Sequence, residues 1–429
     1  MLKWSKRAKG DCVMQRTAKF GSYIIIPLKY DEQTFDTEKL AAALEKQSVT
    51  TMDLNENVKE IFNRSEHVVG SCYAVPQEKL CAGLDGAKDF EVRSEEGQYA
   101  FTIGRSYLYW FHTQVAFLCL QVTYDDMGAI SRICNPGFAQ NPARFYYGCG
   151  GQMRQFSMER WLDEFLTPLG LRKFFDGESS YLLDAYVYLL AVMPQRFAAL
   201  EEMRQITFNL HQMVPVDSCV EDDSEADLRY VYAVKTPALG TYRWGCCVAS
   251  QTISYVFADP EMDLEAEMHT QALDGLPVVL LAMYEKYTCI RFTQLITQKE
   301  KQTMKQIRSL KKTMLEFQAF GTVTPANLSR WHNVKQIYAD LLEVSDVENA
   351  VEDVSSKIGI LAEHQEELER SRSETLINLI TLFGIISILA SVLDIVELLS
   401  GGGKLIWVSM IVTNLALLLS MWLAMRTRK

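Results

Sequence analysis

The chain has 429 residues, of which 48% are hydrophobic and 23% charged, and its formal net charge at pH 7 is −11. This composition excludes a disordered or fibrous protein, and the length predicts two or three structural units. The negative charge argues against a nucleic-acid partner. Ten cysteines without a CxxC pair and six histidines without HExxH spacing indicate free thiols, and they predict neither a zinc site nor an enzyme.

Residues 1–276 mix strand and helix signals, which predicts a cytosolic domain of the α/β or α+β class. The first 19 residues are basic but precede no apolar run long enough for a signal peptide, so we expect the amino terminus in the cytosol. This basic segment either touches the anionic inner leaflet or is a solvated tail. The predicted strands include Tyr23–Leu28, Val115–Val122, and a hairpin of Arg229–Lys235 with Tyr242–Phe257; the predicted helices include Met158–Leu166 and Tyr181–Met193, continued toward Met213.

Helical periodicity dominates from Pro277 onward, and residues 277–374 are predicted to form a helical stalk. Pro277 suits a first helical turn, while Gly321 and Pro325 indicate a reversal of the chain. After the reversal, the low content of helix breakers predicts one continuous helix from Ser329 to Val396, about 100 Å long at the usual rise per residue.

Apolar residues recur along this helix at heptad spacing, with one three-residue stammer after Val344. Such a seam requires a partner helix. The simplest partner is a sister copy in an oligomer, and pairing with the segment Pro277–Phe317 of the same chain is a second partner compatible with the first. The seam consists of Val334, Ile337, Leu341, Val344, Val347, Val351, Val354, Ile358, Leu361 and Leu368.

Residues 375–429 contain two charge-free runs, Thr375–Leu393 with 19 residues and Leu405–Met425 with 21. Each is long enough to cross a hydrocarbon core of about 30 Å as a helix, so we predict two transmembrane helices. Arginines precede the first run and basic residues follow the second, whereas only Lys404 lies between them. The positive-inside rule then places both termini in the cytoplasm of a multi-pass protein of the cell membrane.

Polar or small residues recur through the first span at spacings of three and four, which suits one broad face that avoids lipid. This face either lines a pore or packs closely against other helices. Asp394 and Glu397 form acidic rings in an oligomer, or they lie in the headgroup region. The predicted pore-lining residues are Asn378, Thr381, Gly384, Ser387, Ser391, Asp394 and Glu397.

Two acidic runs in the body could hold Mg²⁺ or another divalent cation, because clustered carboxylates are the ligands that such ions prefer. The candidate ligands are Asp222 and Asp223 in one run, and Asp259 and Asp263 in the other. Neither run has EF-hand spacing, and solvated loop charge is the alternative interpretation. The sequence gives no sign of any other cofactor.

The order of these features resembles the CorA-type magnesium transporter superfamily. The resemblance rests on Leu280–Phe292 (LLAMYEKYTCIRF) leading into a long helix, and on Ser373–Leu382 (SETLINLITL) at the start of the first span. It covers the last 150 residues or so and the body only loosely. The Gly-Met-Asn signature of the family is missing, and the chain reads from Ser391 to Lys404 as SVLDIVELLSGGGK instead.

The resemblance implies a homopentamer in a lipid bilayer, with the first span around a central pore and divalent cations as cargo or regulators. It also implies that the cytosolic domain gates the pore. The missing signature puts magnesium selectivity in question. The alternative function is that of a membrane-anchored sensor or effector, whose cytosolic domain binds a small signalling ligand and which does not transport Mg²⁺ selectively.

Overall fold

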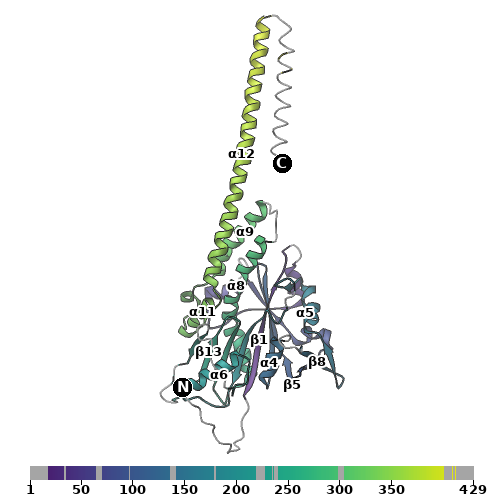
Figure 1. The fold of residues 1–429 in the computed structure, drawn as a ribbon, viewed down its shortest axis with the longest axis vertical. Coiled ribbons are helices and arrows are strands. Elements are labelled where there is room, and N and C mark those ends of the chain that lie inside the picture. The colour runs from purple at the N-terminus through teal and green to yellow at the C-terminus, as the bar shows by residue number, and fades with distance from the viewer. Residues whose placement is uncertain are drawn as a thin grey trace, which may run out of the picture. The chain divides into compact units, whose positions relative to one another are not determined.

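A mixed α/β sheet domain and a long helix that follows it make up the described part of the protein, as a computed structural model (Figure 1). The structure describes residues 18–32, 35–63, 70–95, 97–135, 142–177, 180–218, 228–233, 235, 240–297 and 304–400, together with Val408 and Ile411. By its internal contacts the chain divides into two compact units, residues 1–301 with 312–355 and residues 302–311 with 356–429. Each unit is described by itself.

Strands prevail in the first 257 residues and helices after them, as the change in sequence pattern predicts. The strands are β1 Lys19–Lys29, β2 Glu45–Gln47, β3 Gly70–Val75, β4 Asp89–Ser94, β5 Gly97–Ile103, β6 Ser106–Phe111, β7 Val115–Tyr124, β8 Arg144–Cys149, β9 Gln152–Phe156, β10 Arg172–Lys173, β11 Tyr186–Val192, β12 Arg229–Tyr232, β13 Trp244–Val248 and β14 Thr252–Phe257. The main helices are α1 Thr37–Ala43, α2 Glu56–Asn63, α3 Gln77–Leu80, α4 Met127–Cys134, α5 Met158–Leu166, α6 Leu200–His211, α7 Leu264–Leu273, α8 Gly275–Thr297, α9 Met304–Glu316, α10 Pro325–Leu328, α11 His332–Val344 and α12 Val347–Ser400.

Strand β1 lies in the middle of one large sheet, in which it pairs antiparallel with both β11 and β7. The strand order is β12-β13-β14-β11-β1-β7-β5-β4-β8-β9, and β6, β3 and β2 branch from β7. Strands β11 and β14 pair in parallel. All but the first of the residues of β1 are buried, which suits its run of apolar residues with no polar face.

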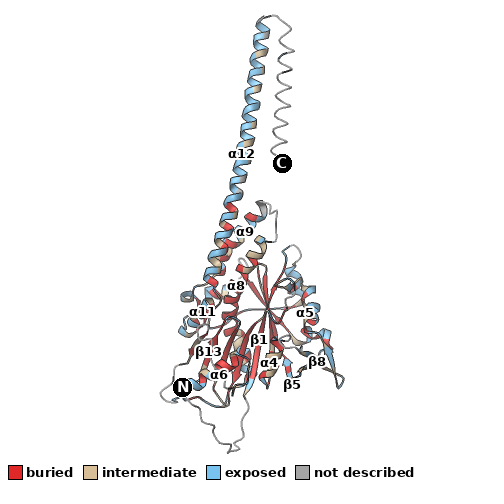
Figure 2. Cartoon of the chain, in the orientation of Figure 1, coloured by how far each residue is buried: buried red, intermediate tan, exposed pale blue. Residues whose placement is uncertain are grey.

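Helices cover both faces of the sheet, and the core lies between these layers (Figure 2). On one face, Ile24 and Ile26 of β1 share a hydrophobic core with residues of α4, α5 and α6. On the other face, the Tyr23 hydroxyl donates to the carbonyl of Met268 in α7 at 2.9 Å. The alternation of side chains along β1 therefore places the α7, α8 and α11 layer opposite the α4 to α6 layer.

Helix α8 belongs to the body, although its sequence predicts the start of a separate stalk at Pro277. It starts at Gly275, and most of its residues up to Phe292 are buried. The Tyr284 ring stacks on Phe111 of β6 with centroids 4.1 Å apart. The body thus continues through α8, because this mostly apolar helix packs against the sheet and α11.

Within the predicted helix Tyr181–Met193, residues 186–192 form strand β11 instead. Strand β11 is buried along its whole length between β1 and β14. A fully buried strand reads as a continuous apolar run, which periodicity cannot distinguish from a buried helix. The helix predicted to continue toward Met213 does exist as α6, but it starts only at Leu200. The predicted hairpin is also shorter, because β13 and β14 divide the segment Tyr242–Phe257.

A break between α11 and α12 interrupts the helix that was predicted to be continuous. It lies at Ser345 and Asp346, where the sequence shows the stammer, and Asp346 has a left-handed φ of 52°. The predicted reversal is confirmed, since α10 starts at Pro325 after a π-helical turn that ends at Gly321. The single glycine Gly359 does not interrupt α12.

The apolar seam has partners within the chain over its first half. Val334, Ile337 and Leu341 are buried where α11 packs on α8, β12 and β13. In the second unit, Arg308 of α9 pairs with Glu369 of α12 at 2.8 Å, and Lys311 approaches Glu366 at 4.0 Å. This antiparallel pairing within one chain agrees with the second of the two predicted partners. Val334, Ile337 and Leu341 of the seam thus have partners within the chain.

Candidate pore-lining segment

The second half of α12 is the part of the described chain that is suited to a membrane. Within Val347–Val396 the most apolar window has a mean hydropathy of 2.5 and no buried residue. Ile380, Ile388 and Leu398 are 69%, 66% and 90% exposed. Such a continuous apolar surface requires lipid or a partner helix. The second predicted span, Leu405–Met425, lies outside the described residues except for Val408 and Ile411.

Four of the seven predicted pore-lining residues lie together on one side of the helix. At about 100° per residue, Asn378 and Asp394 lie roughly 160° apart around the axis, so the seven positions do not share one face. Gly384, Ser387, Ser391 and Asp394 lie within about 80° of one another, and all four are exposed. We call these four residues the polar stripe.

The polar stripe and the partly covered side of α12 lie at different positions around the helix axis. Five half-exposed residues lie on that other side, roughly 115° around the axis from the stripe at the usual helical rotation. Asn378 and Thr381 are exposed but lie off the stripe. The polar stripe is thus open for contact with a neighbouring helix. The half-exposed residues are Thr375, Leu379, Ile386, Ala390 and Leu393.

Two of the hydroxyl groups are satisfied by the helix itself. Thr381 Oγ1 donates to the carbonyl of Ile377 at 2.8 Å, and Ser391 Oγ donates to the carbonyl of Ser387 at 2.9 Å. Such bonds to the preceding turn let Ser and Thr lie in an apolar environment without another partner. Hydroxyls alone therefore do not distinguish a pore from close packing, and the charge of Asp394 is the stronger sign. The side chain of Glu397 lies outside the described part.

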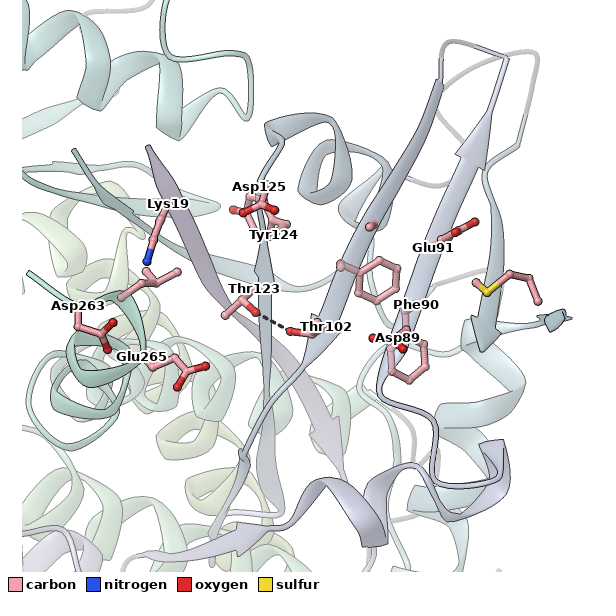
Figure 3. Close-up of a pocket in the computed structure, with 14 residues that line it drawn as sticks. Lys19, Asp89, Phe90, Glu91, Thr102, Thr123, Tyr124, Asp125, Asp263 and Glu265 are labelled. Atoms are coloured by element: carbon pink, nitrogen blue, oxygen red, sulfur yellow. Dashed lines mark hydrogen bonds between the residues drawn. The ribbon is translucent and has the colours of Figure 1, made fainter. Parts of the chain in front are cut away.

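An acidic hollow of about 410 Å³ opens on the body, far along the chain from α12 (Figure 3). Its acids come from different elements, with Asp89 on β4, Asp125 after β7 and Asp263 at the start of α7. Lys19 is a basic residue of the lining. Among the described residues, no group of three or more His, Cys, Asp or Glu side chains is placed to hold a metal ion.

Both described metal candidates have structural roles. The Asp259 carboxylate lies between Arg196 and Arg243, at 3.7 and 3.6 Å. The Asp263 carboxylate accepts from the amide of Ala266 at 3.0 Å and caps α7. Both oxygens of Asp259 and one oxygen of Asp263 therefore have partners within the chain, and a metal role for these residues stays a prediction. Asp222 and Asp223 lie outside the described residues.

Two charged side chains are buried at one end of β1, and the sequence pattern does not predict them. Lys29 is fully buried and its Nζ lies 2.7 Å from the exposed carboxylate of Asp176. Arg291 of α8 is 2% exposed and donates to Gln114 Oε1 at 2.7 Å and to the carbonyl of Tyr30 at 3.3 Å. Burial lowers the pKa of both basic groups. The signal that could have found them is a charged residue that directly follows a short apolar run, IIIPL before Lys29 and YTCI before Arg291.

Comparisons with known proteins add little to this picture. No family model matches the sequence, and no curated protein matches it. Among solved structures, the chain is similar to the CorA magnesium transporter from Methanocaldococcus jannaschii, with a TM-score of 0.22 and 10% sequence identity. The match covers 59% of this chain and 93% of that one. Such a TM-score is too low to support a conclusion about function, which therefore depends on the residues of this chain.

Proposed function

We propose that this chain is one subunit of a CorA-like, homo-oligomeric membrane channel that passes cations and is gated by its cytosolic domain. Both termini lie in the cytosol in this proposal, and the polar stripe of each subunit faces a shared axis. Five subunits and a divalent cargo such as Mg²⁺ are the arrangement that the sequence resemblance implies. The proposal makes the chain a transporter and not an enzyme.

The observation that carries the proposal is the position of Asp394 within an exposed apolar helix surface. A carboxylate at this depth is costly in hydrocarbon unless it meets water or a partner. Gly384, Ser387 and Ser391 precede it on the same side of α12, and their small side chains allow sister helices to approach closely. A ring of Asp394 carboxylates then attracts cations at one end of the stripe.

The connection between α11 and α12 supports gating by the body. Helix α11 packs on α8 and on the edge of the sheet, and only Ser345 and Asp346 separate it from α12. A rearrangement that shifts α11 on the body therefore acts on α12 through a very short link. Transmission of this kind, from a packed element to a neighbouring helix, is common in proteins that switch between two states.

Ion flux into liposomes that contain the purified full-length chain tests the proposal. We expect flux of at least one of Mg²⁺, Ni²⁺, Co²⁺, Na⁺ and K⁺. Asp394→Asn should reduce the flux or change the order of preference among these ions, because it removes the ring of charge while keeping the size of the side chain. Glu352→Gln removes an exposed charge from the same helix outside the apolar part, and it should leave the flux unchanged.

The absence of the Gly-Met-Asn signature favours a second candidate. Here the chain is a membrane-anchored sensor or effector whose body binds a small ligand, without selective transport. Absence of flux for all five ions, from a protein that is folded and oligomeric, would replace the channel by this second function. Equal flux in wild type and Asp394→Asn would eliminate the acidic ring.

A further inference from the structure

A small hollow of about 170 Å³ lies on the face of the sheet that α8 and α11 cover. Strands β13 and β14, the junction of α7 and α8, the segment before α2 and helix α11 all contribute to it. The hollow is smaller than the roughly 300–1,000 Å³ of pockets for drug-sized ligands, so it suits a small molecule or a single head group. Its main lining residues are Asp53, Trp244, Tyr255, Phe257, Gln271 and Asn333.

Three aromatic side chains of the sheet form one wall of the hollow. Trp244 of β13 lies directly opposite Phe257 of β14, and Tyr255 follows on the same face of β14. The rings of Tyr255 and Phe257 are nearly parallel, with centroids 6.3 Å apart. Tyr255 also stacks on Tyr188 at 5.1 Å, which holds its ring in place. Aromatic faces carry negative potential and attract cations.

The Asp53 carboxylate lies half-buried beside this wall. Within the described residues it accepts no hydrogen bond and makes no ion pair, and the nearby charge that acts on it belongs to another acid, Asp274. Burial and then this like charge raise the pKa of Asp53 to about 6, so the group is mostly ionised at pH 7. The hollow therefore combines an unpaired negative charge with three aromatic side chains.

Other classes of ligand suit this site less well. An anion would face both Asp53 and Asp274, and a neutral apolar molecule would bury Asp53 without a counter-charge. A hard metal ion needs several oxygen ligands, whereas Gln271 Oε1 already accepts from the Tyr188 hydroxyl. No metal-holding group of acids occurs among the residues that the structure describes. An organic cation satisfies the charge and the aromatic wall together.

We propose that this hollow binds a small organic cation of the quaternary ammonium type. Trp244, Tyr255 and Phe257 contact its methyl groups, and the Asp53 carboxylate supplies the counter-charge. Because Asn333, Val334 and Ile337 of α11 also line the hollow, a bound cation contacts the helix and the sheet at once. Because binding does not require ion conduction, a test of binding at this site gives its result whether or not the chain is a channel.

Choline and its neutral isostere 3,3-dimethyl-1-butanol test the proposal, because they have the same shape and differ in charge. Full-length protein labelled with 5-fluorotryptophan reports binding through the ¹⁹F resonance of Trp244, which Trp244→Phe identifies. We expect choline to shift this resonance saturably and to bind at least about tenfold more tightly than the alcohol, a difference of about 1.4 kcal/mol. Asp53→Asn should weaken choline binding by about tenfold and leave alcohol binding unchanged.

Asp89→Asn is the matched control, since it removes an exposed acid of β4 outside this hollow. It should keep the affinity for choline. Because burial disfavours the charged form of Asp53, Asp53→Asn should fold at least as well as wild type, and its unfolding midpoint checks this. Equal affinity for choline and the alcohol, unchanged binding in Asp53→Asn, or no binding of choline to the folded protein would each overturn the proposal.

Discussion

The Tyr338 hydroxyl on α11 donates a hydrogen bond of 2.6 Å to Oε1 of Glu285 on α8. The same oxygen accepts from the backbone amide of Val323, in the segment between the π-helical turn and α10, at 3.1 Å. Glu285 is 4% exposed. One buried carboxyl group thus joins three segments of the helical layer that covers the sheet.

Because of Glu285, the folding stability of the protein should depend on pH. Burial raises its pKa from the usual 4.5 to about 7, although the bonds from Tyr338 and Val323 oppose the shift. The folded protein therefore binds this proton more tightly than the unfolded chain does, and its contribution to stability is lost as the pH rises from about 4.5 to 7. The shift corresponds to about 3 kcal/mol in the free energy of unfolding.

Chemical unfolding between pH 5 and 8 checks this prediction with the variant Glu285→Gln, which keeps an acceptor for Tyr338. We expect the variant to gain stability relative to wild type as the pH rises through this range. Glu202→Gln, an exposed acid on α6, should follow the wild-type curve. Parallel curves for wild type and Glu285→Gln would contradict the prediction.

Removal of Asp176, the exposed partner of the buried Lys29, should destabilise the protein. In Asp176→Asn, Lys29 keeps its charge in a fully buried position without a carboxylate, which is unfavourable. The side chain of Asp176 is 68% exposed, so water screens the pair and we expect a loss of only about 1–2 kcal/mol. Urea unfolding measures it. Lys29→Met removes the buried charge and should restore much of the loss in the double variant.

Two substitutions of Asp346, the residue with a left-handed φ between α11 and α12, should differ in their effect on stability. Asp346→Ala and Asp346→Gly both remove the carboxylate that accepts from Asn349 at 2.6 Å. Only Ala is strained at a φ of 52°, so it should destabilise the protein by about 1 kcal/mol more than Gly. Unfolding free energies of the two variants give this difference directly, and equal values would mean that the break at Asp346 is absent.

A large side chain within the polar stripe should weaken the oligomer without disturbing the single chain. A Cβ atom added at Gly384 meets no atom of the described residues within 4 Å beyond the adjoining backbone of α12, and the same holds for Gly359 earlier on α12. Gly384→Leu should therefore weaken the oligomer by obstructing close approach between sister helices, whereas Gly359→Leu should not. Mass measurement of the detergent-solubilised complexes distinguishes the two variants, and intact oligomers of Gly384→Leu would exclude contact along the stripe.

The amino-acid sequence alone determined the features that depend on local pattern. The long apolar helix segment needs only residue type and length, and the reversal near Pro325 needs only the breakers Gly321 and Pro325. The order of a sheet-rich body followed by helices is equally visible along the chain. These features hold whatever the rest of the chain contacts, because the cost of burying polar backbone and the limits on φ act within a few residues.

Tertiary structure decided what depends on distant partners. Residues 186–192 became a strand because β1 and β14 lie on both sides of them, and the seam of α11 found its partners in α8 and the sheet edge. Asp53 and Trp244 line the same hollow, although their residue numbers differ by 191. Periodicity records which side of an element is apolar, but it does not record what covers that side.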